Sequence, residues 1–245
     1  MTQVSSAPRV SSAGFSLPVP SAPGGEVPAY GAFPEGAARG VVVVHEIFGP
    51  QPEIEDVVQR FANAGYAAIS PNFFHKPGYV ACVRQMLHAC NTGEGPQVEI
   101  AKSARRYLVE RTGLEEAQIG LIGFCIGGGF VLGMGKGWGA VSTNYGAVPP
   151  KERLDGFGPV IGCYGGQDLV FGKMGRRLKK ELEPAGTPLE VHEFPTVGHS
   201  FLTNGHHPIA KAISYPFYRI RYDRDVAEDA WSKIFAFFEH NLTPR

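Results

Sequence analysis

IGLIGFCIGGGFVL, residues 119–132, is the stretch that decides the fold. Its first residues form a short apolar run typical of a buried strand, and its last residues begin a helix. Cys125 stands between them, with Gly123 two residues before it and Gly127 two residues after it. Small residues at these positions allow a strand to turn abruptly into a helix and expose the central side chain, as in the G-x-S-x-G nucleophile elbow. The stretch therefore predicts a reactive thiol in place of the usual serine.

Cys125 also has a second interpretation, as a buried structural cysteine beside packing glycines. The legible strand before it and the legible helix after it favour the nucleophile. The turn further directs the thiol toward the N-terminus of the following helix, where the backbone amides and the helix dipole stabilise a thiolate.

Strands and helices alternate on both sides of this stretch. Short apolar runs bounded by Gly, Pro or polar residues predict buried strands at 41–44, 67–69 and 160–163, and stricter alternation predicts a sheet-edge strand at 189–194. Apolar residues at helical spacing predict helices at 53–64, 98–110, 173–182 and 225–240. In the last helix the apolar stripe comprises Ala227, Ala230, Trp231, Ile234, Phe235 and Phe238. This order implies right-handed crossovers, and hence an α/β fold with a mostly parallel twisted sheet and helices on both faces.

Composition excludes several classes of protein. The 245 residues carry 23 Lys and Arg against 23 Asp and Glu, so the chain lacks the basic excess that binding to a phosphate backbone requires. Its apolar runs are far shorter than the roughly 20 residues that span a bilayer, and the N-terminus shows no basic-then-apolar signal segment. We therefore expect a soluble, cytoplasmic protein with neither nucleic acid nor membrane as a partner.

The sequence predicts one domain that follows a partly extended or disordered N-terminal segment. Gly, Pro and Ser are concentrated near the N-terminus, so residues 1–25 are predicted to be a partly extended or disordered lead-in. Residues 26–245 show no internal repeat and no break in composition. A chain of this length buries enough apolar surface to need neither disulfides nor a metal for its core.

Two later strands are also followed by reactive side chains. Asp168 follows the strand at 160–163, and His199 follows the strand at 189–194. Taken singly, Asp168 would be interpreted as a turn residue, and His199 as a surface or core histidine whose hydrogen bonds are made within the fold. Together with Cys125 they stand in the order nucleophile, acid, histidine, which is that of the α/β-hydrolase triad. His199 would take the thiol proton and later activate water, while Asp168 would fix the orientation and tautomer of the imidazole.

The segment His45-Glu46-Ile47-Phe48-Gly49 follows the first predicted parallel strand. This loop normally supplies one amide of an oxyanion hole, and the residue after the nucleophile supplies the other, which predicts the backbone N–H groups of Ile47 and Ile126. Glu46 is either a helix-entry acid or a carboxylate that accepts or holds the thiol proton.

Five stretches carry a resemblance to a known family: His-Glu-Ile-Phe-Gly, Gly-Tyr-Ala-Ala-Ile-Ser-Pro-Asn, Gly-Phe-Cys-Ile-Gly-Gly, Gly-Gly-Gln-Asp and Gly-His-Ser-Phe. Together they resemble the dienelactone hydrolase (carboxymethylenebutenolidase) family from about residue 27 to the C-terminal helix. The resemblance implies a single-domain α/β-hydrolase without a large lid domain, monomeric and free of cofactors and metals. It places the triad on Cys125, His199 and Asp168.

The resemblance carries further implications for the pocket. It implies that Glu46 holds the resting thiol and that ligand binding swings the sulfur toward the histidine as a thiolate. Phe48 and Tyr145 match positions that line the family's substrate pocket. The function it implies is hydrolysis of small esters or lactones through a covalent acyl-enzyme.

The chain departs from the family in the groups that hold a substrate carboxylate. One arginine is expected shortly after 199–201, where this chain has Leu202-Thr203, and another after 71–74, where it has His75-Lys76. Lys76 or Arg84 would be the substitutes, but a lysine does not reproduce the bidentate fork of an arginine. The identity of the substrate therefore stays open.

The spacing of the cysteines and glycines does not fit the motifs of several other classes of site. Cys82, Cys90 and Cys163 do not form a metal motif, and a chain without a secretory signal seldom forms disulfides. The glycine cluster fits neither the dinucleotide fingerprint nor the phosphate loop. A glutamine amidotransferase also uses a cysteine elbow, but with an acid two residues after the histidine, which this chain lacks. That enzyme class, and a non-catalytic binding protein on the same fold, remain the alternatives.

Overall fold

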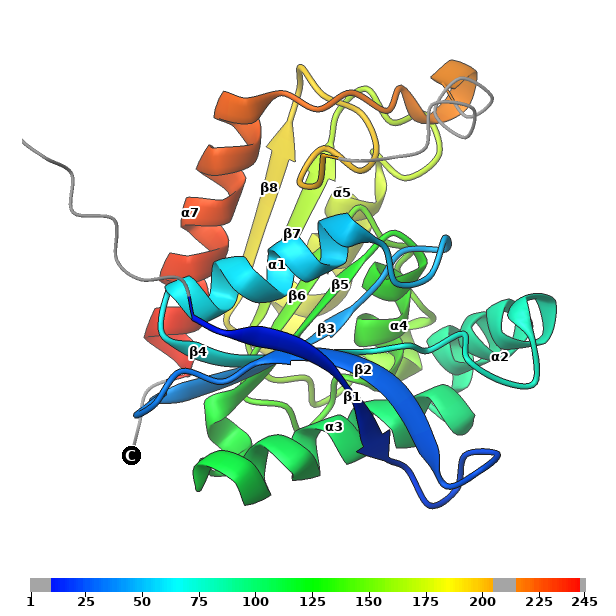
Figure 1. Ribbon diagram of the computed structural model, residues 1–245. Coiled ribbons are helices and arrows are strands. Elements are labelled where there is room, and N and C mark those ends of the chain that lie inside the picture. Colours follow the sequence, from blue (N-terminus) through cyan, green and yellow to red (C-terminus); the bar gives the residue numbers. More distant parts are fainter. Residues whose placement is uncertain (1–9, 205–214, 243–245) are drawn as a thin grey trace, which may run out of the picture.

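The computed structural model describes residues 10–204 and 215–242, and these build a twisted sheet flanked by helices on both faces (Figure 1). The strands are β1 (Ser12–Pro18), β2 (Glu26–Ala32), β3 (Arg39–Val44), β4 (Tyr66–Pro71), β5 (Ile119–Phe124), β6 (Val141–Asn144), β7 (Val160–Gly165) and β8 (Leu189–Phe194). The helices are α1 (Pro52–Asn63), α2 (Tyr79–Thr92), α3 (Pro96–Thr112), α4 (Ile126–Met134), α5 (Met174–Leu182) and α7 (Arg224–Asn241).

The sheet has the order β1-β2-β4-β3-β5-β6-β7-β8 over the described residues. β1, β2 and β4 pair antiparallel, and every pairing from β4 through β3 to β8 is parallel. The register pairs Val44 with Gly123, Phe124 with Asn144, and Gly165 with Phe194. The carboxyl ends of β3, β5, β6, β7 and β8 therefore lie along one edge, where ligands bind in sheets of this kind.

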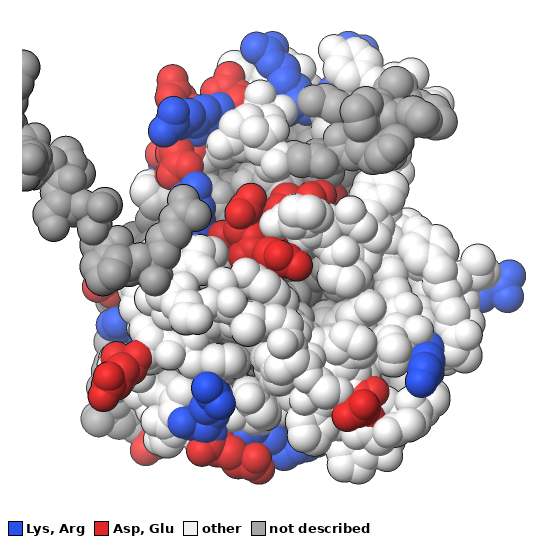
Figure 2. Space-filling view, viewed as in Figure 1, with Lys and Arg blue, Asp and Glu red and all other residues white. Residues whose placement is uncertain are grey.

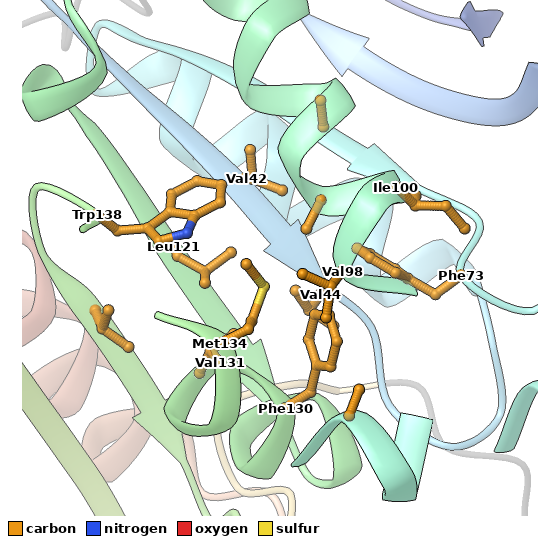
Figure 3. Packing of buried hydrophobic residues seen from close by; sticks show 14 of the residues in the cluster. Val42, Val44, Phe73, Val98, Ile100, Leu121, Phe130, Val131, Met134 and Trp138 are labelled. Atoms are coloured by element: carbon orange, nitrogen blue, oxygen red, sulfur yellow. The ribbon is translucent and has the colours of Figure 1, made fainter. Parts of the chain in front are cut away.

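Each face of the sheet has its own core. On one face, side chains of β3 and β5 pack against α3 and α4, and Figure 3 shows Val42, Val44 and Leu121 in one cluster with Val98 of α3 and Phe130 and Met134 of α4. On the other face, α1 and α7 cover the sheet through a second cluster of buried apolar residues. A fully buried side chain of this size contributes about 1.5–3 kcal/mol by leaving water, so both layers hold the strand ends in place.

The predicted strands and helices agree with the structure in type and order. All four predicted helices are present as α1, α3, α5 and α7, and the strand at 189–194 is the sheet edge β8. In α7, however, Phe237 is buried while Phe235 is half-buried, because Phe235 packs over Phe61 at the rim of the core. The sequence patterns did not predict β1, β2, β6 or α2.

Part of the predicted lead-in belongs to the sheet. Residues 12–18 form β1, which pairs with β2 from Ser12 opposite Ala32 to Pro18 opposite Glu26. Residues 1–9 lie outside the described residues. The expected boundary at residue 25 thus falls inside a strand pair rather than before the sheet.

Surface charge and helix hydropathy bear on the expected partners. No helix in 10–204 or 215–242 is long and apolar enough to cross a membrane. On the face shown in Figure 2, Lys and Arg side chains are scattered among Asp, Glu and uncharged residues, and no broad positive surface is present there.

Candidate active site

Cys125 forms an abrupt turn between β5 and α4. Its backbone has φ of 56° and ψ of −119°, a conformation that costs a non-glycine residue free energy. A Cβ atom on Gly123 would lie 2.1 Å from the carbonyl oxygen of Gly127, and a Cβ on Gly127 would lie 2.7 Å from that of His45. Only glycine fits at either place, which explains the spacing of the elbow.

His199 and Asp168 form a buried pair beside this turn. His199 Nδ1 donates a hydrogen bond to Asp168 Oδ2 at 2.6 Å. The other carboxylate oxygen, Oδ1, accepts hydrogen bonds from the backbone N–H groups of Val170 and Phe171, both at 2.9 Å. The two backbone donors hold the carboxylate in one orientation, and the carboxylate in turn fixes the imidazole.

The charge of His199 is set by its neighbours. Burial lowers the pKa of His199, but attraction to Cys125 and the hydrogen bond to Asp168 raise it to about 10. Nε2 is buried and makes no hydrogen bond with the described residues, and His199 lines the same cavity as Cys125. A thiolate at Cys125 would therefore face an imidazolium at neutral pH.

Aromatic rings surround the His199 imidazole. The rings of Tyr145, Tyr218 and Phe171 lie 4.9, 5.1 and 5.3 Å from it, measured between centroids. These rings exclude water from the side of the imidazole and so strengthen its hydrogen bond to Asp168.

The backbone at 217–218 joins the two loops that carry the acid and the histidine. Leu169 N–H donates to the carbonyl of Phe217 at 3.0 Å, and His199 N–H donates to that of Tyr218 at 2.7 Å. Gly198 packs so closely here that a Cβ would lie 2.4 Å from the Tyr218 oxygen. One short segment thus sets the spacing between Asp168 and His199.

Glu46 lies buried at the carboxyl end of β3 and receives hydroxyl groups. Tyr145 Oη donates to Oε1 at 3.2 Å, Ser200 Oγ to Oε2 at 3.1 Å, and Thr203 Oγ1 to Oε1 at 3.4 Å. Thr203 thus contacts Glu46 close to the place where an arginine was expected. That Glu46 holds the resting thiol stays a prediction.

The two backbone amides predicted for an oxyanion hole belong to residues on the wall of one cavity. Ile47 follows Glu46 in the loop after β3, and Ile126 is the first residue of α4. The first amides of a helix have no partner inside it, so the Ile126 N–H is available to a ligand.

The cavity holds about 480 Å³ and is mostly apolar. Its described lining includes Cys125, His199, Glu46, Phe48, Tyr79, Leu87, Cys90, Val148, Pro149, Phe171, Tyr218 and Ile220. Phe48 lies at the mouth, 42% exposed. Tyr145 lies elsewhere, fully buried behind Glu46 and His199, and neither Lys76 nor Arg84 is among the described lining residues.

Several residues of the site carry no signal in the sequence. Phe171 and Tyr218 surround His199, and Ser200 and Thr203 contact Glu46, but single aromatic or hydroxyl residues in loops are too common to be diagnostic. Positive φ angles mark the site more clearly, because Cys125, Tyr145 and Ser200 all adopt them. Such strain is visible only in the fold.

His45, the first residue of the segment that contains Glu46, is fully buried. Its Nδ1 bonds the Glu46 carbonyl at 2.8 Å, and the Phe73 N–H donates to its Nε2 at 3.1 Å. Burial lowers the pKa of His45 from its ordinary value of 6.5 to about 4, and the bonds to backbone groups only partly oppose this.

The buried His45 predicts a loss of stability in acid. Between pH 6.5 and about pH 4 the unfolded chain binds a proton that the folded chain does not, so stability falls as pH falls, by roughly 3 kcal/mol over the window. Denaturant unfolding at pH 7 and pH 4.5 measures this. His45→Gln should lose less stability on acidification than the parent, and an equal loss would contradict the assignment.

The other three cysteines differ in their place relative to the cavity: Cys90 lines it, with its Sγ 3.9 Å from the Ile126 carbonyl oxygen, whereas Cys82 and Cys163 are not among its described lining residues. Cys82, Cys90 and Cys163 are buried free thiols, and Cys82 donates a weak hydrogen bond to the carbonyl of Lys76. Burial, the largest cause, raises the pKa of Cys90 to about 12 and raises that of Cys163. A thiol that holds its proton this firmly is a poor nucleophile, which argues against that role for Cys90 and Cys163.

Comparison with known proteins agrees with this architecture. A carboxymethylenebutenolidase of Rhodococcus opacus is 26% identical over 237 residues, which cover 85% of this chain and 83% of that protein. A solved dienelactone hydrolase-like promiscuous phosphotriesterase from metagenomic libraries superposes with a TM-score of 0.75 at 19% identity, over 96% of this chain and 99% of that one. An acylaminoacyl peptidase of Pyrococcus horikoshii gives a TM-score of 0.70 at 12% identity, over 96% of this chain and 42% of that one.

The solved structures share the fold alone, since their identities are low. The family itself follows from a sequence model of the dienelactone hydrolase family, which matches residues 27–242 and so spans every element from β2 to α7. By that match the chain belongs to the dienelactone hydrolase family, with the α/β-hydrolase fold that its sheet order displays.

Proposed function

We propose that this protein hydrolyses small esters or lactones through a covalent acyl-enzyme on Cys125. The observation that carries the proposal is the buried His199–Asp168 hydrogen bond, on the same cavity as the strained elbow residue Cys125. A histidine held in this way is equipped to exchange protons with a thiol and with water.

The first half of the reaction forms the acyl-enzyme. The Cys125 thiolate attacks the substrate carbonyl carbon, and the carbonyl electron pair moves onto oxygen, where the N–H groups of Ile47 and Ile126 stabilise the negative charge. When the tetrahedral intermediate collapses, the C–O bond to the alcohol breaks and the His199 imidazolium donates its proton to that oxygen. The alcohol leaves, and the acyl group remains on sulfur.

The second half regenerates the enzyme. Neutral His199 takes a proton from a water molecule, whose oxygen attacks the thioester carbonyl in the same oxyanion hole. The C–S bond breaks, the acid departs, and the thiolate and imidazolium are restored. Asp168 keeps Nδ1–H in place throughout, so that Nε2 is always the atom that exchanges protons.

Glu46 is proposed to manage the resting thiol. A carboxylate at the carboxyl end of β3 can accept a hydrogen bond from the neutral thiol, which keeps its proton until the sulfur turns to His199 and passes the proton to Nε2. The three hydroxyl donors of Glu46, Tyr145, Ser200 and Thr203, hold the carboxylate in position without adding a charge of their own. The resting enzyme is then protected until a ligand enters. All of these groups come from a single chain, which supports a monomer as the working unit.

The cavity favours uncharged substrates. Its described walls are mostly apolar, with Phe48, Tyr79 and Leu87 at or near the mouth and no Lys or Arg among them. A carboxylate on the acyl group would lose its hydration there without gaining a cationic partner from these walls. We therefore propose neutral esters and lactones as the substrate class, and the shared family chemistry supports a lactone among them.

The test combines acyl-enzyme detection with a matched pair of substrates. Acid quenching during turnover of p-nitrophenyl butyrate, followed by peptide mass spectrometry, should show one butyryl group on the peptide that contains Cys125. An ester of similar size with a terminal carboxylate on its acyl group should react with a kcat/KM lower by roughly tenfold or more. An adduct on another residue, or glutamine hydrolysis in its place, would point to a different enzyme class. Binding without turnover would indicate a non-catalytic protein.

A further inference from the structure

His45 is a buried, titratable side chain for which the proposed mechanism has no use. It stands directly before Glu46 at the end of β3, and its side chain is fully buried. The rings of Phe73 and Phe74 pack edge-on against it at 5.5 and 4.7 Å. Burying a polar ring among apolar groups costs free energy unless its nitrogen atoms form hydrogen bonds.

The hydrogen bonds of His45 fix its tautomer. The Glu46 carbonyl can only accept, so His45 Nδ1 must carry the proton that bridges the 2.8 Å between them. The Phe73 N–H can only donate, so Nε2 must be bare at 3.1 Å. One neutral tautomer satisfies both contacts, and the lowered pKa keeps the ring neutral at physiological pH.

The Glu46 carbonyl and the Ile47 N–H belong to the same peptide group. The cis peptide among the described residues is Lys76-Pro77, so this peptide is trans and its C=O and N–H point in opposite directions. The carbonyl is held by His45 and by the Gly49 N–H at 3.1 Å. The Ile47 N–H makes no hydrogen bond within 10–204 or 215–242, and Ile47 lines the cavity.

We propose that His45 is a positioning residue for the oxyanion hole: by holding the Glu46 carbonyl from behind, it aims the Ile47 N–H at the substrate oxygen. Phe73 completes the arrangement, because its N–H ties the imidazole to the segment after β4. The inference rests on the proposed function, since it assumes that Ile47 stabilises a developing oxyanion. A donor that is held in advance needs no reorganisation during the reaction, which is the source of its catalytic value.

Two conservative variants separate the two hydrogen bonds of His45. Asparagine places its amide where Nδ1 lies, so His45→Asn keeps a donor for the Glu46 carbonyl and loses the acceptor for Phe73. Glutamine places its amide where Nε2 lies, so His45→Gln keeps the acceptor and loses the donor. We expect kcat for a p-nitrophenyl ester to fall about 10- to 100-fold in His45→Gln with little change in KM, and to fall only a few-fold in His45→Asn.

Alkylation by iodoacetamide is the internal control. Attack on iodoacetamide uses the same thiol but develops no oxyanion, so its rate at Cys125 should match the parent in His45→Gln. The carbonyl stretching frequency of a slowly hydrolysed acyl-enzyme gives a second readout: it should lie higher in His45→Gln than in the parent, because one of the two polarising donors is misplaced.

Each outcome decides the proposal. Equal kcat in His45→Gln and the parent would overturn the role of His45, while the acyl-enzyme in both would leave the proposed function standing. Parallel losses of ester turnover and alkylation in both variants would show that His45 only supports the fold. A parent that forms no acyl-enzyme at all would overturn the proposed function and this inference together.

Discussion

Replacing Cys125 by alanine is expected to lower kcat/KM for ester hydrolysis by at least about a thousandfold. The variant removes the atom that forms the acyl bond, and the remaining amides and His199 can only assist direct attack by water, which is a far weaker route. Initial rates on p-nitrophenyl butyrate measure the loss, and burst amplitude in a stopped-flow trace should vanish.

Cys82→Ser is the matched control for that variant. Cys82 is a buried thiol outside the cavity, and serine preserves its hydrogen bond to the carbonyl of Lys76. Its activity should stay within a few-fold of the parent. If Cys125→Ala hydrolysed the ester as fast as Cys82→Ser, Cys125 would not be the nucleophile.

Replacing Asp168 by asparagine is expected to lower kcat by about 10³- to 10⁴-fold, the size seen when the acid of another triad is changed in this way. The cause lies in the two backbone donors, Val170 N–H and Phe171 N–H, which demand an oxygen at the Oδ1 position. An asparagine that supplies this oxygen must turn its NH₂ group toward His199. Nδ1 then has to accept, and Nε2 carries the proton that it should be free to take.

The titration of His199 checks this explanation apart from activity. The hydrogen bond to Asp168 is one of the causes that raise the pKa of His199, so its NMR-detected pKa should fall in Asp168→Asn. Asp155→Asn, an exposed change in the segment before β7, should leave both kcat and the titration as in the parent. An unchanged pKa in Asp168→Asn would rule out the inverted tautomer as the reason for lost activity.

The sequence predicted the parts of the site that depend on chain order. Parallel strands end on one edge of a sheet, so apolar runs followed by Cys125, Asp168 and His199 were enough to bring three distant side chains together in expectation. The structure joins Asp168 and His199 by a hydrogen bond of 2.6 Å, and Cys125 and His199 line the same cavity. Periodicity also located the long helices, because each buries one apolar stripe against the sheet.

Elements without a strong pattern were missed for physical reasons. β6 is four residues long and partly polar, and its strand state depends on its neighbours β5 and β7 rather than on propensity. α2 buries Cys82, Met86, Ala89 and Cys90, which are weak hydrophobic signals. The burial and hydrogen bonds of His45 could not be predicted, because the local sequence around a buried histidine does not differ in a recognisable way from that around an exposed one.

The segment 217–218, which joins the loops that carry Asp168 and His199, has a consequence for redesign of this enzyme. Backbone N–H groups of the acid loop and of the histidine loop both donate to carbonyls of this short segment. The two loops and the segment are therefore held in fixed relative positions, although they are separate in sequence. Transplanting a foreign loop at 166–172 or 196–203 alone would leave the segment with a mismatched partner and would shift Asp168 relative to His199. A graft that exchanges both loops together with 215–220 keeps the spacing between the acid and the histidine. Changes of specificity are therefore best made with that complete block. The alternative is the cavity wall at α2, which lies outside these backbone hydrogen bonds.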